Sequence, residues 1–184
     1  EALWEFEKQF PQSWLYNMPL VLQINGLLNF KALEYAFKGL IKRHAGFRSV
    51  FFEKEGGTPY QKILNDMPIT IKVKNLEDVS QKEIKTIIKA EEQRKLDITT
   101  GPLIRVTLLR LSNKIHLLLL TIHHIVFDGW SYEVIFKDIS YYYNDYIKGR
   151  FIPLESLPLK YVDFIQWERE YALSTTIHNQ LKYW

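Results

Sequence analysis

Two adjacent histidines, His123 and His124, lie at the end of a strongly apolar run. Their side chains are the ones in this sequence best suited to proton transfer. Asp128 and Gly129 follow closely, and a helix is predicted to begin near Ser131. A histidine at the end of a strand can accept or hold a proton near neutral pH. The glycine lets backbone approach a reacting group, and a helix start offers free N–H donors. This combination is typical of an acyl-transfer site.

Because consecutive residues of a strand point to opposite faces, His123 and His124 are not expected to hold one metal ion together. The three or four convergent ligands that zinc requires are not evident in the sequence, so we predict no metal site. We interpret one ring as facing a cavity, where it accepts a proton from an attacking amine or hydroxyl, and the other as packed and hydrogen-bonded. The alternative is that both rings are satisfied core or loop residues.

Asp128 also has two interpretations. It could act as a base, but a carboxylate beside a turn more often makes a salt bridge or caps backbone N–H groups. We favour a structural role with an arginine partner. The candidates within the chain are Arg43, Arg48, Arg105 and Arg110, and an arginine outside this sequence is a further candidate.

The elements that position these residues follow from periodicity and turn signals. Residues 103–110 and 115–124 predict an antiparallel hairpin, and the second strand, apolar on both faces, is expected to be central and covered on both sides. Helices are predicted over 31–44 with Asn29 as cap, from Asp78 or Ser80 to about Arg94, after Ser131 as a cap, and over most of 161–184. Shorter strands are predicted over 19–24, 47–52, 60–64 and 69–73. Together these elements predict a mixed α/β sandwich.

Composition limits the class of protein. The 184 residues are 47% hydrophobic and 24% charged, which is typical of one globular domain or one lobe of a larger one. The net charge is +3, with basic and acidic residues intermixed, so we predict no nucleic-acid partner. The longest apolar run is too short to cross a membrane, and the absence of cysteine fits a cytoplasmic protein. The N-terminus lacks the basic and apolar regions of a signal peptide. Because it also lacks an initiator methionine, we expect the sequence to be cut from a longer chain.

Several familiar catalytic patterns are absent from the sequence. It has no G-x-S-x-G elbow, no Walker loop and no G-x-G-x-x-G, which argues against a serine hydrolase, an NTPase and a dinucleotide enzyme. With no cysteine, it also lacks a thiol nucleophile. A base without a protein nucleophile favours direct transfer, in which the acceptor substrate itself attacks.

Motifs along the whole chain resemble the N-terminal half of a condensation domain from nonribosomal peptide synthetases. The segment IHHIVFDGWS at 122–131 resembles the His-His core of that family. Further matching segments, in order, are RHAGFRSVF at 43–51, GPLIR at 101–105, YVDFIQW at 161–167 and LKYW at 181–184. The chain departs from the family at Ala45 and Gly46, where many members have a glutamate and another residue, and it lacks the usual opening Ser-x-Ala-Gln.

The resemblance implies a chloramphenicol-acetyltransferase-like fold of two lobes with a tunnel between them. Residues 1–184 would form the N-terminal lobe, and the C-terminal lobe would be absent from the chain. The implied reaction is amide bond formation between an acyl or peptidyl thioester donor and an aminoacyl thioester acceptor. Each substrate is carried on the phosphopantetheine of a carrier protein, with no cofactor bound directly. The implied partners are the donor and acceptor carrier proteins, an adenylation domain of a larger chain, and the second lobe.

The resemblance also assigns roles to residues. It implies that His124 is catalytic, either as a base or as a group that orients the amine, and that His123 supports it. Asp128 would be structural, Gly129 would line the active site, and Trp130 would contact substrate. Ser131 would also bind substrate. Arg43 and Arg48 would form packed salt bridges.

Two other functions remain open from the sequence. One is a stand-alone acyltransferase of the same superfamily, which forms an ester from acyl-CoA or a carrier-bound acyl group. The other is a non-catalytic lobe that only docks carrier proteins. If the chain is a condensation lobe, we expect the isolated lobe to have little or no activity, because the resemblance places the far wall of the tunnel in the missing lobe.

Overall fold

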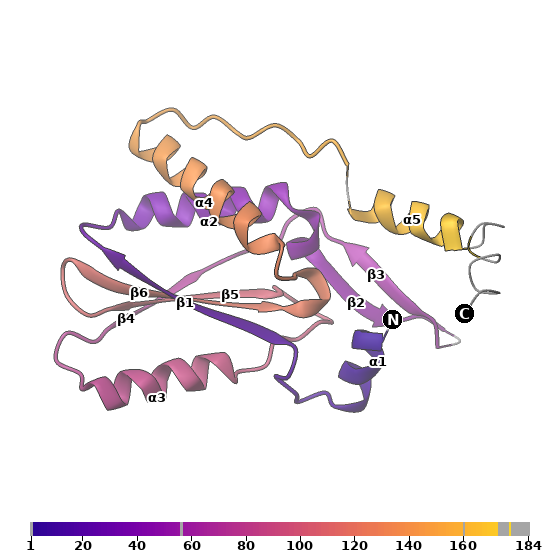
Figure 1. The fold of residues 1–184 in the computed structure, drawn as a ribbon, viewed down its shortest axis with the longest axis horizontal. Coiled ribbons are helices and arrows are strands. Elements are labelled where there is room, and N and C mark those ends of the chain that lie inside the picture. The colour runs from indigo at the N-terminus through magenta and orange to yellow at the C-terminus, as the bar shows by residue number, and fades with distance from the viewer. Residues whose placement is uncertain (1, 56, 160, 173–176, 178–184) are drawn as a thin grey trace. The chain divides into compact units, whose positions relative to one another are not determined.

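A four-stranded mixed sheet in the order β1-β6-β5-β4 lies at the centre of the fold (Figure 1). β6 (Ile115–His123) pairs antiparallel with β1 (Asn17–Asn25) and with β5 (Ile104–Arg110), and β4 (Ile71–Asn75) pairs parallel with β5. The β5–β6 hairpin and the mixed sheet confirm the sequence predictions. His124, predicted as the last residue of this strand, lies just beyond its end.

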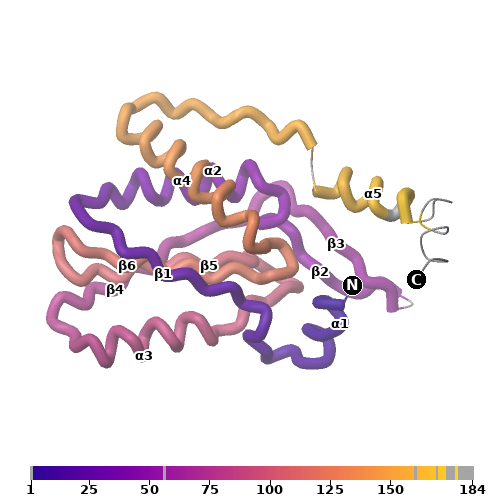
Figure 2. The backbone as a smooth tube through the Cα atoms, in the orientation of Figure 1, coloured from indigo at the N-terminus to yellow at the C-terminus, as the bar shows by residue number. Residues whose placement is uncertain are grey.

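The computed structural model describes residues 2–55, 57–159, 161–172 and 177. The chain divides into two compact units, Glu1–Leu154 and Glu155–Trp184. The first unit contains the sheet, four helices and the histidines, and Figure 2 follows its backbone from α1 to the end of α4.

Strand β6 is covered on both faces, as its apolar pattern predicted. Leu118, Leu120 and Ile122 lie in the main core, beneath α2 (Phe30–Arg43) and α4 (Ser131–Ile147). Leu117 and Leu119 face the opposite side and pack with residues of α3 (Gln81–Glu92). The two layers of helices are visible above and below the sheet in Figure 1. The end of β6 is therefore fixed from both sides.

Local sequence signals explain where the helices begin and how closely they pack. The Asn29 side chain accepts a hydrogen bond from the backbone N–H of Ala32 at 3.0 Å, which caps α2. Ser80 forms a reciprocal capping box at the start of α3. In α2, a Cβ atom at Gly39 would lie only 2.8 Å from the Tyr142 ring. Glycine at this position therefore lets α2 and α4 approach each other closely.

The remaining elements of the first unit include a helix that the sequence did not predict, α1 (Ala2–Gln9). A second sheet consists of β2 (Ser49–Glu53) paired with β3 (Pro59–Ile63). The strand predicted from residue 47 begins two residues later, because Ala45–Arg48 forms a 3₁₀ helix.

The second unit contains α5 (Tyr161–Ala172), which confirms a helix in that region. Its aromatic rings contact one another along one side of the helix, with centroids 5.8 Å apart for Phe164 and Trp167 and 5.3 Å apart for Trp167 and Tyr171. The predicted motif at 181–184 lies outside the described residues. None of the helices in the described ranges is both long and apolar enough to cross a membrane.

Candidate active site

The backbone changes direction between the two histidines. His123 is the last residue of β6, and His124 begins a short 3₁₀ turn, His124–Val126. The backbone N–H of His123 donates to the carbonyl oxygen of Leu103 at 3.0 Å, and that of His124 donates to the carbonyl oxygen of Tyr16 at 2.8 Å. The two rings consequently occupy different environments: the His123 residue is only 2% exposed, whereas His124 is exposed.

The hydrogen bond of the His124 ring determines which nitrogen can act. Nδ1 lies 2.6 Å from the carbonyl oxygen of Phe127. Because a carbonyl oxygen only accepts, Nδ1 must carry a hydrogen and donate it. In the neutral ring, the lone pair is then on Nε2, which is free to accept a proton. An exposed imidazole held in this way is a suitable general base.

The buried His123 ring has a supporting geometry. Its Nδ1 accepts a hydrogen bond from the backbone N–H of Ile125 at 3.1 Å, so the ring caps the turn that carries His124. Its Nε2 lies 3.3 Å from Oε1 of Glu7. Burial, and after it the Coulombic interaction with the His124 ring, lowers the pKa of His123 to about 4, so the His123 ring is neutral at pH 7. One histidine is thus packed and the other exposed, as predicted, whereas the cavity predicted to face the exposed ring stays a prediction.

Glu7 was missed in the sequence analysis. It is buried in α1 beside this strand end, and burial raises the pKa of its carboxyl group. A signal was available, because Trp4 and Glu7 are three residues apart and lie on the same face of the helix. A glutamate that shares a helical face with a buried tryptophan is a candidate for a buried role.

The structure contradicts an arginine partner for Asp128 among the four candidates within the chain, whereas an arginine outside this sequence stays a prediction. Oδ1 of Asp128 instead accepts hydrogen bonds from the backbone N–H of Ser131 at 2.9 Å and from its hydroxyl at 2.6 Å. The Ser131 hydroxyl is the main cause of a lowered pKa of Asp128. Ser131 is therefore the first residue of α4 and not its cap, which is Trp130 and makes no side-chain capping hydrogen bond. The first backbone N–H of the helix is instead satisfied by the Asp128 carboxylate. Asp128 thus bonds to a residue only three positions away, and the four candidate arginines contact other groups.

Arg43 forms the packed salt bridge predicted for it. Its Nη1 lies 2.9 Å from Oδ1 of Asp138, whose other carboxylate oxygen lies 2.6 Å from Nε2 of His44. Asp138 belongs to α4 and is buried, so this cluster joins α2 to the helix that follows the candidate site.

Arg48 does not form the salt bridge predicted for it. Its guanidinium donates to backbone carbonyl oxygens, including that of Ile41 at 3.2 Å and that of Leu64. The last carbonyl oxygens of a helix lack donors within the helix. Arg48 therefore donates hydrogen bonds to backbone carbonyl oxygens and not to a carboxylate. Arg105 lies against Glu91, and Arg110 lies 3.3 Å from Glu77.

Gly129 and Trp130 are not held by packing in this structure. Apart from its two chain neighbours, no described residue has an atom within 4 Å of a Cβ built at Gly129, and the Trp130 residue is 90% exposed. The fold of this unit therefore requires neither glycine nor tryptophan at these positions. Their assignments to the active site and to substrate contact stay predictions.

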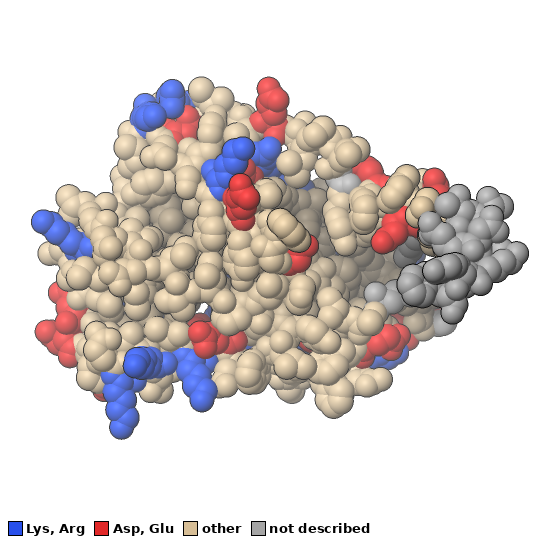
Figure 3. All heavy atoms as spheres, viewed as in Figure 1, with Lys and Arg blue, Asp and Glu red and all other residues tan. Residues whose placement is uncertain are grey.

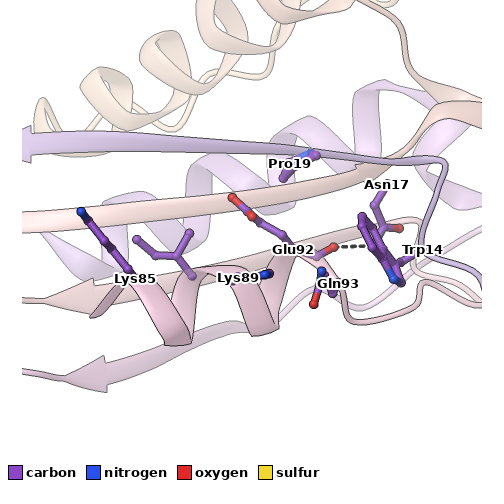
Figure 4. A pocket seen from close by; sticks show the side chains of 8 residues that line it. Trp14, Asn17, Pro19, Lys85, Lys89, Glu92 and Gln93 are labelled. Atoms are coloured by element: carbon purple, nitrogen blue, oxygen red, sulfur yellow. Dashed lines mark hydrogen bonds between the residues drawn. The ribbon is translucent and has the colours of Figure 1, made fainter. Parts of the chain in front are cut away.

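Other surface features lie away from the histidines. A groove of about 300 Å³ runs between β1 and α3, and Figure 4 shows Trp14, Asn17, Lys85 and Lys89 lining it. Neither histidine lines it. No group of three potential metal ligands occurs within the part of the chain that the structure describes. On the face shown in Figure 3, acidic and basic side chains are interspersed.

Comparison with known sequences places the chain in a family. A family model described as Condensation domain matches residues 1–184. One of the linear gramicidin synthase proteins of Brevibacillus parabrevis is 33% identical over 188 residues, a match that covers 100% of this chain and 2% of that protein. Malpinin synthetase of Mortierella alpina is 32% identical over 186 residues, covering 100% and 2% respectively. The chain thus spans a small fraction of the length of these relatives.

Comparison with solved structures confirms the fold class. The starter condensation domain of rhizomide synthetase superposes with a TM-score of 0.86 at 22% identity, covering 100% of this chain and 44% of that chain. The SgcC5 protein of Streptomyces globisporus, solved in complex with an aryl ethanediol and sucrose, superposes with a TM-score of 0.78 at 27% identity, covering 94% and 39%. The mixed sheet and its helices are therefore arranged as in chloramphenicol-acetyltransferase-like condensation domains.

Proposed function

Because the chain belongs to the condensation domain family, we propose that it supplies the catalytic histidine for amide bond formation in nonribosomal peptide synthesis. The observation that carries this proposal is the state of His124. Its Nδ1 is committed to the Phe127 carbonyl oxygen and its ring is exposed, so Nε2 is available to an incoming amine.

In the proposed reaction, the acceptor amine nitrogen attacks the carbonyl carbon of the donor thioester. A C–N bond forms, the C–S bond breaks, and the sulfur leaves as a thiolate. The proton lost by the attacking nitrogen passes to Nε2 of His124 and then to the thiolate, so no external acid or base is consumed. An α-amine has a pKa of about 8, so part of it is already unprotonated at neutral pH. For that fraction, His124 can also serve by orienting the amine nitrogen toward the thioester.

The neighbouring residues have supporting roles in this proposal. His123 holds the turn that contains His124, and Asp128 holds the turn that follows it. In this proposal neither side chain touches substrate. Gly129 leaves open space beside the turn, where a thioester could approach the backbone. Trp130 and Ser131 lie at the adjoining start of α4, and we assign them to substrate contact.

The proposal includes partners that complete the site. Donor and acceptor carrier proteins present the thioesters on phosphopantetheine arms, and an adenylation domain loads them. A second lobe supplies the opposite wall of a tunnel between the lobes, so residues 1–184 alone are expected to show little or no activity.

The direct test is peptide formation from two loaded carrier proteins. It compares residues 1–184, the protein extended through a second lobe, and the extended protein with His124→Ala. We expect product from the extended protein and a sharp loss in the variant, with an unchanged circular dichroism spectrum. Near-normal product formation by the His124→Ala variant would exclude the assigned role. A folded extended protein that binds carriers without forming product would favour the carrier-docking function.

A second candidate is ester formation with a hydroxyl acceptor. It is supported by the similarity to SgcC5, whose solved structure holds a diol. The same exposed Nε2 could remove a hydroxyl proton as the oxygen attacks. Replacing the acceptor amine by the matching hydroxyl compound in the same assay separates the two candidates.

A further inference from the structure

The N-terminal segment of the chain holds the end of β6 at three separate points. Trp4 of α1 is buried with Ile98 and Leu103, and Ile125 and Val126 of the histidine turn pack against this cluster. The Tyr16 carbonyl oxygen accepts the backbone N–H of His124. The third point is Glu7, whose carboxylate faces the His123 ring.

Burying the Glu7 side chain costs folding free energy unless its carboxyl group has a polar partner. The residue is 5% exposed, and Oε1 is buried without a hydrogen bond of good geometry to any described residue. Its polar contact is Nε2 of His123, at 3.3 Å. Lys95 is the cation that favours the ionised form, while burial favours the neutral acid. Both forms keep an oxygen lone pair that can accept the Nε2 hydrogen.

We propose that Glu7 is a positioning residue that selects the tautomer of His123 and thereby fixes the turn that presents His124. The catalytic part of this inference rests on the function proposed for His124, whereas the tautomer can be measured without it.

The hydrogen-bond pattern gives the physical reason. With its hydrogen on Nε2, His123 can accept the backbone N–H of Ile125 at Nδ1, as observed. In the other tautomer, an Nδ1 hydrogen would oppose that N–H, because both groups are donors. The cap of the turn would be lost. The Phe127 carbonyl oxygen that holds His124 Nδ1 lies at the end of the same turn, so His124 would lose its fixed orientation too.

The test uses the protein extended through a second lobe, with ¹⁵N-labelled histidine. The shifts of both ring nitrogens report the tautomer of each histidine, and His123→Asn and His124→Ala assign the signals. Glu7→Leu removes the acceptor, whereas Glu7→Gln keeps a carbonyl oxygen of similar reach. The matched control is Glu5→Leu, the same change at an exposed position of the same helix.

We expect wild type and Glu7→Gln to have His123 protonated at Nε2, and Glu7→Leu to show a mixture of tautomers. In carrier-dependent peptide formation, Glu7→Leu should lower kcat about tenfold or more with little change in KM, since it disturbs a group that orients a functional histidine. Glu7→Gln and Glu5→Leu should stay close to wild type. A purely structural role would lower stability without changing the tautomer.

Each outcome decides the matter. Finding the hydrogen on Nδ1 of His123 in wild type overturns the proposal, even if Glu7→Leu fails to fold. It is also overturned if Glu7→Leu keeps the wild-type tautomer, or changes the tautomer with an undiminished kcat. If wild type forms no peptide while the tautomer responds as expected, the proposed reaction fails and the positioning of His123 by Glu7 stands.

Discussion

Replacing Asp128 tests whether this carboxylate caps a helix or takes part in chemistry. In the structure, it accepts two hydrogen bonds from Ser131 at the start of α4. Asparagine caps helices about as well as aspartate, because its side-chain oxygen accepts the same backbone N–H, whereas alanine has no acceptor. Asp128→Asn should therefore keep most of the stability, and Asp128→Ala should lose it.

The magnitude follows from the two bonds. Removing a capping acceptor costs about 1 kcal/mol, and the second, charge-assisted bond to the Ser131 hydroxyl is exposed and adds less, so Asp128→Ala should cost about 1–2 kcal/mol. For a protein of this size, each kcal/mol lowers Tm by about 2–4 °C. Because the Ser131 hydroxyl lowers the pKa of Asp128, this stabilisation is present above the pKa of an unfolded aspartate. It is lost as the pH falls through the lower value of the folded state.

Urea unfolding at neutral and acidic pH measures the loss of unfolding free energy and its dependence on pH. Peptide formation by the extended protein measures function. In a double-mutant cycle, Ser131→Ala should remove only the hydroxyl share of the Asp128→Ala effect. We expect Asp128→Asn to be stable and active. If Asp128→Asn is as stable as wild type but inactive, the carboxylate acts in the chemistry and a purely structural role is refuted. If Asp128→Ala is as stable as wild type, the capping argument is refuted.

Three further predictions concern neighbouring groups. Asp138→Ala should lower the free energy of unfolding by about 3 kcal/mol in urea titrations, because it removes a buried carboxylate and leaves the half-buried Arg43 guanidinium without its ion-pair partner. The exposed Glu133→Ala on the same helix should change it by less than about 0.5 kcal/mol. Gly129→Ala should leave Tm unchanged, since its Cβ meets no described atom, and should slow peptide formation if substrate approaches there; an altered Tm would contradict the open geometry. The lowered pKa of His123, about 4, means that its neutral ring stabilises the fold fully above the unfolded pKa of about 6.5. That stability should decline as the pH falls toward 4, and His123→Asn should flatten this part of the stability curve; an unchanged curve would contradict a buried neutral ring.

Local signals predicted most of the fold. The capping residues Asn29 and Ser80 mark the starts of α2 and α3, and the doubly apolar strand at 115–123 lies at the centre of the sheet, as expected. These features depend on nearby residues and on the strand period, both of which a single sequence contains. The burial of His123 and the exposure of His124 arise instead because the chain leaves β6 between them, which the strand period does not predict.

The errors arose where partners had to be chosen among distant residues. Asp128 was given an arginine, although a hydroxyl and an N–H were available three residues away. Arg48 was given a carboxylate, but the end of α2 supplies carbonyl oxygens. The helical face that Glu7 shares with Trp4 indicates a buried role, but it does not identify the partner, His123, which is more than a hundred positions away in the chain. A single sequence has no signal for such long-range pairs.

The pairing of β1 with β6 also has a consequence for how the protein folds. Asn17 is in register with His123, so the strand that carries the histidines meets its partner only after a very long loop has closed. Closing such a loop is entropically slow, whereas the β5–β6 hairpin is local and should form earlier. Until β1 arrives, the leucine-rich edge of β6 is exposed and prone to pair with other chains. We expect slow refolding with concentration-dependent aggregation, and a candidate site that is completed among the last parts of the fold.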